Sequence, residues 1–227
     1  HYPRTKLVCV ENTSNRGGGK VWPLEKLAEV KKTASENGLK THLDGARIWN
    51  AAAAMNIPES EIAKHFDSLS VCFSKGLGAP VGSALAGSND FVMEARRFRK
   101  QFGGGMRQAG IIAAGALYAL ENNRERLTVD HDNAKMLAKG LSEINGIDIN
   151  PDEVETNIIN FRVKGVNIHA LIEKLKKQGT LVLAKDSSTI RAVTNLMVSE
   201  SQINIALDHV SNVMKSSIFL SDMNLFS

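Results

Sequence analysis

Short apolar runs alternate with longer stretches of helical spacing over the first 120 residues of the chain. The short runs have the length and composition that are typical of buried strands. The expected strands cover residues 7–10, 39–44, 68–74 and 82–86. The expected helices cover residues 23–37, 46–55 and 111–120, with a basic helix that begins at residue 88 or 89. This alternation predicts an α/β fold with a largely parallel sheet.

A second pattern begins after the polar residues 121–124. The expected helices here cover about 125–144 and 168–177, and a last helix opens with a Ser199-x-x-Gln202 capping box. The expected strands cover residues 158–163, 181–184 and 189–193. We therefore expect two domains, residues 1–124 with a mostly parallel sheet and residues 125–227 as a smaller α/β domain.

The composition of the chain argues against several classes of protein. The net charge is +4, from 28 basic and 24 acidic residues, but the basic residues are scattered and aromatics make up only 5%, so no nucleic-acid groove is indicated. No stretch approaches the length of a membrane span, and no signal peptide is visible, so a cytoplasmic location is the default expectation. Cys9 and Cys72 lie inside apolar runs and are interpreted as buried thiols. No His, Cys or carboxylate spacing suggests a metal site.

Lys75 ends an apolar run and is followed at once by Gly76, Gly78 and Gly82. A lone lysine at a strand end usually just extends into water. Glycines at this density, however, allow a tight turn and leave room for a ligand. A lysine in a partly dry pocket has a lowered pKa and can attack carbonyl carbons to form a Schiff base.

Asp44 and Arg47 follow the strand expected at 39–44. The plain interpretation of Asp44 is a helix N-cap, since a helix is expected from residue 46. The functional interpretation is a carboxylate at the carboxyl end of a strand, where α/β sheets gather their functional groups. Pyridoxal phosphate needs both a lysine and an acid facing its pyridinium nitrogen. Arg47 is placed to neutralise this carboxylate or to bind a substrate carboxylate.

Two glycine runs resemble anion sites. Residues 103–105 precede Arg107 and an expected helix, which suits a phosphate, although a flexible loop is the plain alternative. Residues 16–21 read RGGGKV and resemble a nucleotide-binding P-loop, but Asn15 and Val21 stand where that loop needs a glycine and a Ser or Thr. We interpret residues 16–19 as a turn.

Four motifs in order carry a family resemblance: ENTSNRGGGKVWPLEKL, HLDGARIWNAA, SKGLGAPVGS and FRKQFGGGMRQAGIIAAGALYAL. Together they resemble the low-specificity L-threonine aldolases, which are pyridoxal-phosphate enzymes of the aspartate-aminotransferase-like fold (fold type I). The resemblance implies that Lys75 carries the cofactor and that Asp44 faces its ring nitrogen. It further implies that Arg107 contacts the cofactor phosphate and that Arg47 and Arg191 bind the substrate carboxylate.

The resemblance also implies a reaction and an assembly. The expected reaction is cleavage of threonine or allo-threonine to glycine and acetaldehyde by a homo-oligomer, a tetramer by analogy. Ser14 stands where the family commonly has a histidine, which leaves the threo or allo preference and the catalytic base open. Family members have about a hundred more residues ahead of His1, so we expect the N-terminal portion to be lacking from this chain. Another pyridoxal-phosphate lyase that performs β-elimination, or a non-catalytic fragment, is the alternative.

Overall fold

The structure is a computed structural model that describes residues 1–223, with side chains described through residue 216. Two compact units divide the chain. The first comprises His1–Asn15 and Lys20–Leu127, and the second comprises Arg16–Gly19 and the residues from Thr128 onward. The expected domains at 1–124 and 125–227 stay a prediction.

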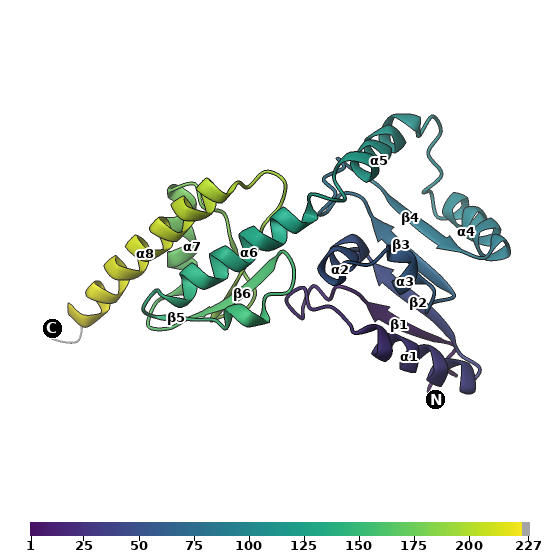
Figure 1. The fold of residues 1–227 in the computed structure, drawn as a ribbon, viewed down its shortest axis with the longest axis horizontal. Helices are drawn as coiled ribbons and strands as arrows, with labels where there is room; N and C mark the ends of the chain where they lie inside the picture. Colours follow the sequence, from purple (N-terminus) through teal and green to yellow (C-terminus); the bar gives the residue numbers. More distant parts are fainter. Residues whose placement is uncertain (224–227) are drawn as a thin grey trace. The chain divides into compact units, whose positions relative to one another are not determined.

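The first unit is built on a four-stranded sheet in the order β1-β2-β3-β4 (Figure 1). These strands are β1 (Leu7–Glu11), β2 (Lys40–Gly45), β3 (Ser68–Cys72) and β4 (Ser83–Gly87). β1, β2 and β3 run parallel, whereas β4 is antiparallel to β3. The predicted α/β fold with a mostly parallel sheet is therefore confirmed, and the carboxyl ends of the three parallel strands share one edge.

Helices α1 (Leu24–Glu36), α2 (Ile48–Met55) and α3 (Glu59–Ala63) pack on one face of this sheet. Their contact side chains, Leu27, Ile48 and Ile62, are almost completely buried and meet Val10 and Leu43 from the sheet. Burial of such side chains stabilises a fold by roughly 1.5–3 kcal/mol each. This core fixes α2 directly after β2, the strand that ends in the Asp44 segment.

The opposite face of the sheet carries smaller and more polar side chains. Cys9 lies on this face, because Val8 and Val10 on either side of it point toward the helices. The expectation of a buried Cys9 is wrong: the residue is exposed, and Cys72 is only half-buried. Both thiols are free, and neither contributes to the core that α1, α2 and α3 form.

Two further helices follow β4, namely α4 (Asn89–Gln101) and α5 (Gly110–Asn122). The hydroxyl of Ser88 accepts a hydrogen bond of 3.3 Å from the Phe91 amide, which confirms the N-cap expected at residue 88. α5 is apolar on nearly all sides, yet Ala119 is its one buried residue. Helices of that composition are usually surrounded by other protein.

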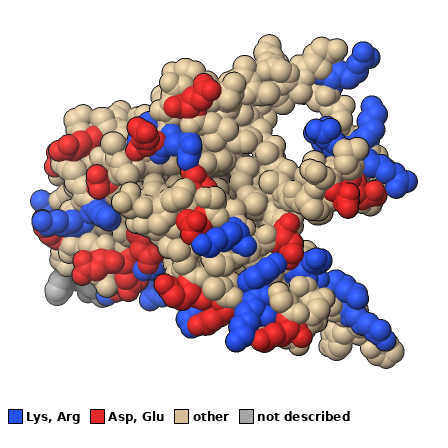
Figure 2. All heavy atoms as spheres, turned by 45° about the vertical axis from the view of Figure 1, so that its right-hand side comes forward, with Lys and Arg blue, Asp and Glu red and all other residues tan. Residues whose placement is uncertain are grey.

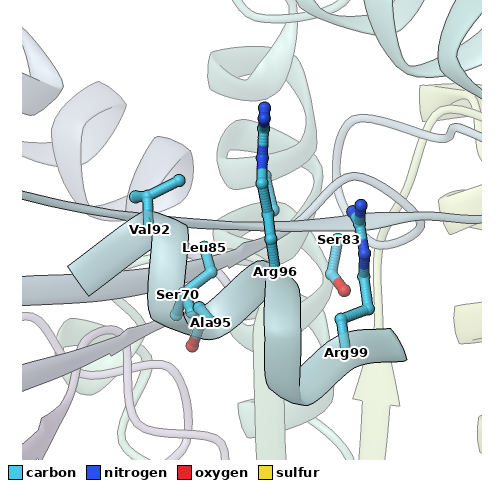
Figure 3. A pocket seen from close by; sticks show the side chains of 8 residues that line it. Ser70, Ser83, Leu85, Val92, Ala95, Arg96 and Arg99 are labelled. Carbon is cyan, nitrogen blue, oxygen red and sulfur yellow. The ribbon is translucent and has the colours of Figure 1, made fainter. Parts of the chain in front are cut away.

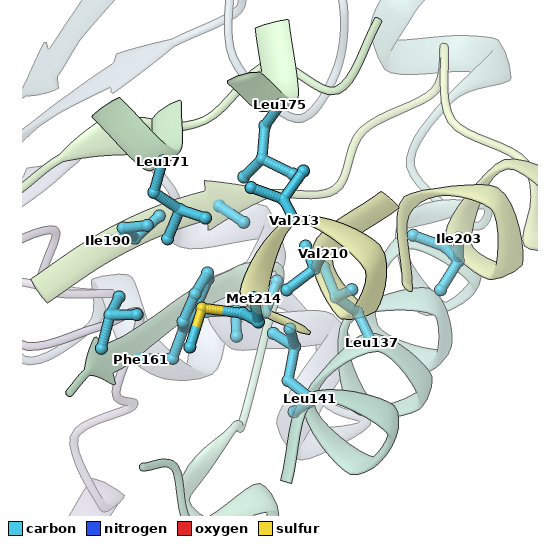
Figure 4. Close-up of a cluster of buried hydrophobic side chains, with 14 of the residues drawn as sticks. Leu137, Leu141, Phe161, Leu171, Leu175, Ile190, Ile203, Val210, Val213 and Met214 are labelled. Carbon is cyan, nitrogen blue, oxygen red and sulfur yellow. The ribbon is translucent and has the colours of Figure 1, made fainter. Parts of the chain in front are cut away.

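The second unit contains an antiparallel sheet in the order β5-β6-β8-β7. Its strands are β5 (Ile147–Asp148), β6 (Ile158–Val163), β7 (Leu183–Ala184) and β8 (Thr189–Val193). The helices of this region are α6 (Leu127–Ser142), α7 (Ile168–Lys177) and α8 (Glu200–Met223), with a short 3-10 turn at Pro151–Glu153. The core packs α6, α7 and α8 against one face of the sheet (Figure 4).

Local signals set several boundaries in this unit. Ser199 and Gln202 form the expected capping box, in which the Ser199 amide donates to Gln202 Oε1 at 2.9 Å and the Gln202 amide donates to Ser199 Oγ at 3.4 Å. The expected turn at residues 16–19 is confirmed, and Thr156, two residues before β6, donates from Oγ1 to the Gly19 carbonyl at 2.8 Å. Among the described residues, no helix combines the length and apolar composition that crossing a membrane requires.

Basic and acidic side chains are interspersed over the visible face of the molecule (Figure 2). This distribution agrees with the scattered basic residues of the sequence.

Candidate active site

Lys75 lies in the loop that joins β3 to β4. The Phe73 amide donates to the Gly82 carbonyl at 3.0 Å, which closes the base of this loop. Inside it, the Gly78 amide donates to the Lys75 carbonyl at 2.9 Å, and Gly78 has a φ of +72°. Lys75 is therefore the first residue of a tight turn that needs glycine at its fourth position. Its side chain is exposed, so the residues of the first unit do not form the partly dry pocket that was expected around it.

Side chains from α2, from the residue that follows α5 and from the start of α6 pack against this loop. A Cβ added to Gly76 would lie 2.9 Å from Asn50 Oδ1 and 3.0 Å from Leu127 Cδ2, so only glycine allows this approach. The Asn123 carboxamide donates to the Leu77 carbonyl at 2.7 Å, and Leu77 itself is 1% exposed. The loop is thus anchored on both sides of Lys75, which restricts where its amine can be.

Aromatic and small residues complete this support. The rings of Trp49 and Phe73 are 5.5 Å apart, which links α2 to the start of the loop. Pro80 packs directly against Gly115 of α5, because a Cβ added to Gly115 would lie only 3.1 Å from Pro80 Cδ. Sequence analysis did not identify Asn50, Asn123 or Gly115, because their role depends on contacts between distant segments.

Asp44 lies near the carboxyl end of β2, beside β3. Its Cα pairs with Ser70 of β3, five residues before Lys75. Asp44 and the loop that carries Lys75 therefore lie at the carboxyl ends of neighbouring parallel strands. Asp44 Oδ1 accepts the Ala46 amide at 3.1 Å, and the carboxylate is exposed. Helix α2 begins at Ile48 with Arg47 as its N-cap residue, so Asp44 does not cap this helix.

Arg47 belongs to a polar group at the ends of β1 and β2. Its Nη2 donates to Asn15 Oδ1 at 3.5 Å. The Asn15 amide in turn donates to Glu11 Oε1 at 3.1 Å, and Ser14 Oγ donates to Glu11 Oε2 at 3.2 Å. Glu11 pairs in register with Asp44, and sequence analysis missed it. The signal was its position at the end of a strand that runs parallel to β2.

Arg107 lies in the connection between α4 and α5. It is exposed and stands three residues before α5, which begins at Gly110, so it is not at the helix start as expected. The glycines before it end α4 instead: Gly103 has a φ of +80°, and the Gly104 amide donates to the Arg99 carbonyl at 2.8 Å. Among the described contacts of the first unit, none joins Arg107 to Asp44 or to Lys75.

Arg191 lies on β8 in the second unit and is half-buried. Asn160 of β6 is its partner in the register of the sheet. Residues directly opposite in an antiparallel pair share a face, and this face is the one opposite the core residues Phe161 and Ile190. Gly18 also approaches this face, because an added Cβ would lie 2.9 Å from Asn160 Nδ2.

A groove of about 530 Å³ lies between α4 and the strands β3 and β4 (Figure 3). Arg96 and Arg99 extend from α4 on one side, and Ser70 and Ser83 belong to the strands. Ser70 is the register partner of Asp44, so the groove begins beside the candidate active site. Sequence analysis did not identify this group, since no local pattern indicates that α4 folds back onto β3.

Known proteins resemble this chain in sequence and in fold. The family model described as "Beta-eliminating lyase" matches residues 1–164. The chain is 40% identical over 216 residues to low-specificity L-threonine aldolase 1 of Arabidopsis thaliana, covering 94% of this chain and 60% of that protein. It is 46% identical over 203 residues to the low specificity L-threonine aldolase of Escherichia coli K12, covering 89% of this chain and 59% of that protein.

Solved structures with a similar fold include a threonine aldolase from Leishmania major, with a TM-score of 0.73 and 21% identity over 92% of this chain and 61% of that one. A PLP-dependent aminotransferase from Streptococcus suis 89-1591 has a TM-score of 0.69 and 16% identity over 94% and 58%. These likenesses confirm the predicted fold type I architecture. The chain spans about 60% of the length of the curated relatives that it matches.

Proposed function

The chain belongs to the beta-eliminating lyase family, and on that premise we propose that it functions as a pyridoxal-phosphate-dependent aldolase. The substrate is L-threonine or L-allo-threonine, and the products are glycine and acetaldehyde. The names of the relatives that are 40% and 46% identical support this substrate. The observation that carries the proposal is the pairing of an anchored Lys75 loop with Asp44 on the neighbouring parallel strand.

The residues present fit the cofactor. Lys75 offers an exposed amine on an anchored turn, which suits a covalent bond to an aldehyde. Only Oδ1 of Asp44 is hydrogen-bonded within residues 1–223, so its other oxygen can face a pyridinium nitrogen. Arg107 would contact the phosphate. When bound, pyridoxal phosphate supplies an electron sink for the bond that breaks.

The two arginines proposed to bind the substrate would orient it in the site. Arg47 and Arg191 bind the substrate carboxylate, since a guanidinium matches a carboxylate through two parallel hydrogen bonds. A carboxylate held in this way would fix which bond at Cα faces the reacting centre, and Asp44 would favour a protonated ring nitrogen in the bound cofactor. Ser14 lies in the polar group of Glu11 and Arg47, where the family commonly has a histidine, so the base that takes the β-hydroxyl proton is not assigned.

A β-eliminating lyase is the second candidate, and the description of the matching family model favours it. It would use the same lysine and aspartate but convert threonine to 2-oxobutyrate and ammonia. Product analysis with threonine separates the two reactions, because the aldolase yields glycine and acetaldehyde. A chain that binds no cofactor is the third outcome and would indicate a non-catalytic fragment.

Cofactor capture tests the proposal on the 227-residue chain. Incubation with pyridoxal phosphate should give a yellow protein, and borohydride followed by peptide mass spectrometry should place the label on Lys75. The Lys75→Ala variant should lose the label, whereas Lys100→Ala, which removes another exposed lysine, should keep it. Labelling spread evenly over surface lysines, or unchanged in Lys75→Ala, would contradict the proposal.

We also propose that the chain assembles as a cytoplasmic homo-oligomer, a tetramer by analogy with the family. The exposed apolar residues of α5 support an assembly: Ile111 is 81% exposed and Tyr118 is 65% exposed. The free thiols of Cys9 and Cys72 are compatible with a reducing compartment. Sedimentation velocity measures the first point, where a monomer at all concentrations would contradict it. Fractionation of expressing cells measures the second.

A further inference from the structure

We propose that the groove between α4 and the strands β3 and β4 binds a phosphate monoester. Its anion is held by Arg96 and Arg99, and its organic group lies against Leu85 and Val92. This site uses none of the residues assigned above to the cofactor or the substrate. It therefore goes beyond the proposed function and does not depend on it.

The two arginines lack the partners that a surface arginine usually has. Neither Arg96 nor Arg99 has an acidic partner among the described residues. Arg97, on the same helix, shows the contrast: its Nη1 lies 3.3 Å from Glu94 Oε1. Arg96 and Arg99 are three residues apart and thus lie on one side of the helix, and both extend to the same side of α4 in Figure 3. Two unneutralised guanidinium groups in one groove favour an anion.

Two hydroxyls complete the polar wall. Ser83 lies next to the two arginines in Figure 3, and Ser70 lies deeper on β3. Within the described part of the chain, neither hydroxyl has a hydrogen-bond partner. Both can donate to an oxygen of the ligand. The groove thus offers donors and no acceptor carboxylate in its lining, which is the pattern expected for an anion site.

The shape and charge of the groove favour a phosphate ester over a simple carboxylate. A phosphate monoester carries about two negative charges near neutral pH and three acceptor oxygens, which match two guanidinium forks and a hydroxyl. A carboxylate offers two oxygens and one charge. The apolar side chains Leu85, Val92 and Ala95 line the rest of the groove. Its volume of about 530 Å³ lies within the range of small-molecule sites and exceeds what an inorganic ion fills.

Titration of the 227-residue chain with phenyl phosphate tests the site. Binding is followed by calorimetry and by the NMR shifts of the arginine Nε–Hε groups. The Arg96→Gln/Arg99→Gln variant should bind at least about tenfold more weakly, since charge-assisted hydrogen bonds are lost. Arg97→Gln, which removes one charge from the same helix outside the groove, should bind as the unsubstituted chain does. Far-ultraviolet circular dichroism checks that each variant is folded.

Two further arms identify the source of the phosphate. In the Lys75→Ala chain, which cannot hold a cofactor covalently, pyridoxal phosphate either competes with phenyl phosphate or binds together with it. Simultaneous binding supports a separate site for a phosphate ester, whereas competition would assign the groove to the phosphate of the cofactor and would overturn the proposal. Benzoate should bind more weakly than phenyl phosphate.

Three further results would overturn the proposal. The first is the absence of phenyl phosphate binding at millimolar concentrations. The second is an equal loss of affinity in Arg97→Gln and in Arg96→Gln/Arg99→Gln, which would indicate general attraction to a basic helix. The third is equal affinity for benzoate and phenyl phosphate.

Discussion

Asn50 Oδ1 lies 2.9 Å from the position that a Cβ on Gly76 would take. This approach joins helix α2, which follows Asp44, to the loop that carries Lys75. Asn50 is 2% exposed and Gly76 immediately follows Lys75, so the contact sets where the lysine stands relative to α2. A glycine that sequence analysis treated as a source of backbone freedom is required here for close packing instead.

Gly76→Ala should destabilise the chain. The added methyl would meet Asn50 Oδ1 and Leu127 Cδ2, which lie 2.9 and 3.0 Å from its position. Overpacking of this kind costs about 1–3 kcal/mol of unfolding free energy, measurable by urea denaturation. Gly110→Ala is the matched control, because nothing lies within 4 Å of its added Cβ, and it should be neutral or slightly stabilising. Equal effects of the two substitutions would show that the packing at Gly76 is not restrictive.

Local signals in the sequence were sufficient to predict several elements. The bounds of β6, α7 and β8 were predicted as observed, because turns and caps delimit them. Asn167, for example, accepts hydrogen bonds from the amides of His169 and Ala170, each at 3.0 Å. Capping and apolar spacing act within a few residues, so one sequence is enough to see them.

Features that depend on distant segments could not be predicted in this way. Cys9 lies in an apolar run, but its exposure depends on which face of the sheet is covered by helices. The glycines at 103–105 suggested an anion site, which stays a prediction, and their part in ending α4 through the hydrogen bond from the Gly104 amide to the Arg99 carbonyl was not expected. The candidate site was likewise predicted only in part. The order of the parallel strands indicated Asp44 and Lys75, whereas the contact of Asn50 with the Lys75 loop can be seen only in the folded structure.

Asp44→Ala should lower aldolase turnover far more than it weakens cofactor binding. Loss of a group that stabilises developing charge typically costs about 100-fold or more in rate. Asp44→Asn keeps an oxygen that can accept the Ala46 amide, which Asp44 Oδ1 accepts at 3.1 Å, and so separates loss of charge from loss of local structure. The measurement is acetaldehyde release with threonine, alongside a titration with pyridoxal phosphate. Normal turnover in Asp44→Ala would remove Asp44 from the mechanism.

Asp67→Asn should destabilise the chain at neutral pH. The Lys31 ammonium, 2.8 Å from Asp67 Oδ2, and the amide and hydroxyl of Thr41 hold the pKa of Asp67 well below its usual range. Hydrogen bonds to a charged group contribute about 1.5–3 kcal/mol each, and the exposed fraction of about one third reduces that value here.

The destabilisation caused by Asp67→Asn should depend on pH. A carboxyl with a lowered pKa stabilises the fold above its ordinary pKa of 3.8, and this contribution is lost as the pH falls further. The difference between Asp67→Asn and the unsubstituted chain should therefore shrink below about pH 4 in urea denaturation. Glu36→Gln, which removes an exposed partner 3.9 Å from Lys32, should have little effect at any pH. A difference that is constant from pH 7 to 2 would contradict the role of the Asp67 charge.

His131 should make the fold less stable in mild acid. Burial is the main cause that lowers its pKa from 6.5 to about 4; Lys135 adds to the effect and Asp132 opposes it. The unfolded chain therefore takes up a proton near pH 6.5, whereas the folded chain resists it until about pH 4. Stability should be fully present above pH 6.5 and fall by about 3 kcal/mol as the pH approaches 4.

Urea denaturation of His131→Gln between pH 7.5 and 4 measures this contribution, because glutamine does not titrate. The variant is expected to start from a lower stability, since it removes a side chain that is 4% exposed. Its loss of stability over this pH range should be smaller than that of the unsubstituted chain. His169→Gln, at an exposed position on α7, should keep the unsubstituted pH profile. Parallel profiles for His131→Gln and the unsubstituted chain would mean that His131 titrates alike in the folded and unfolded states.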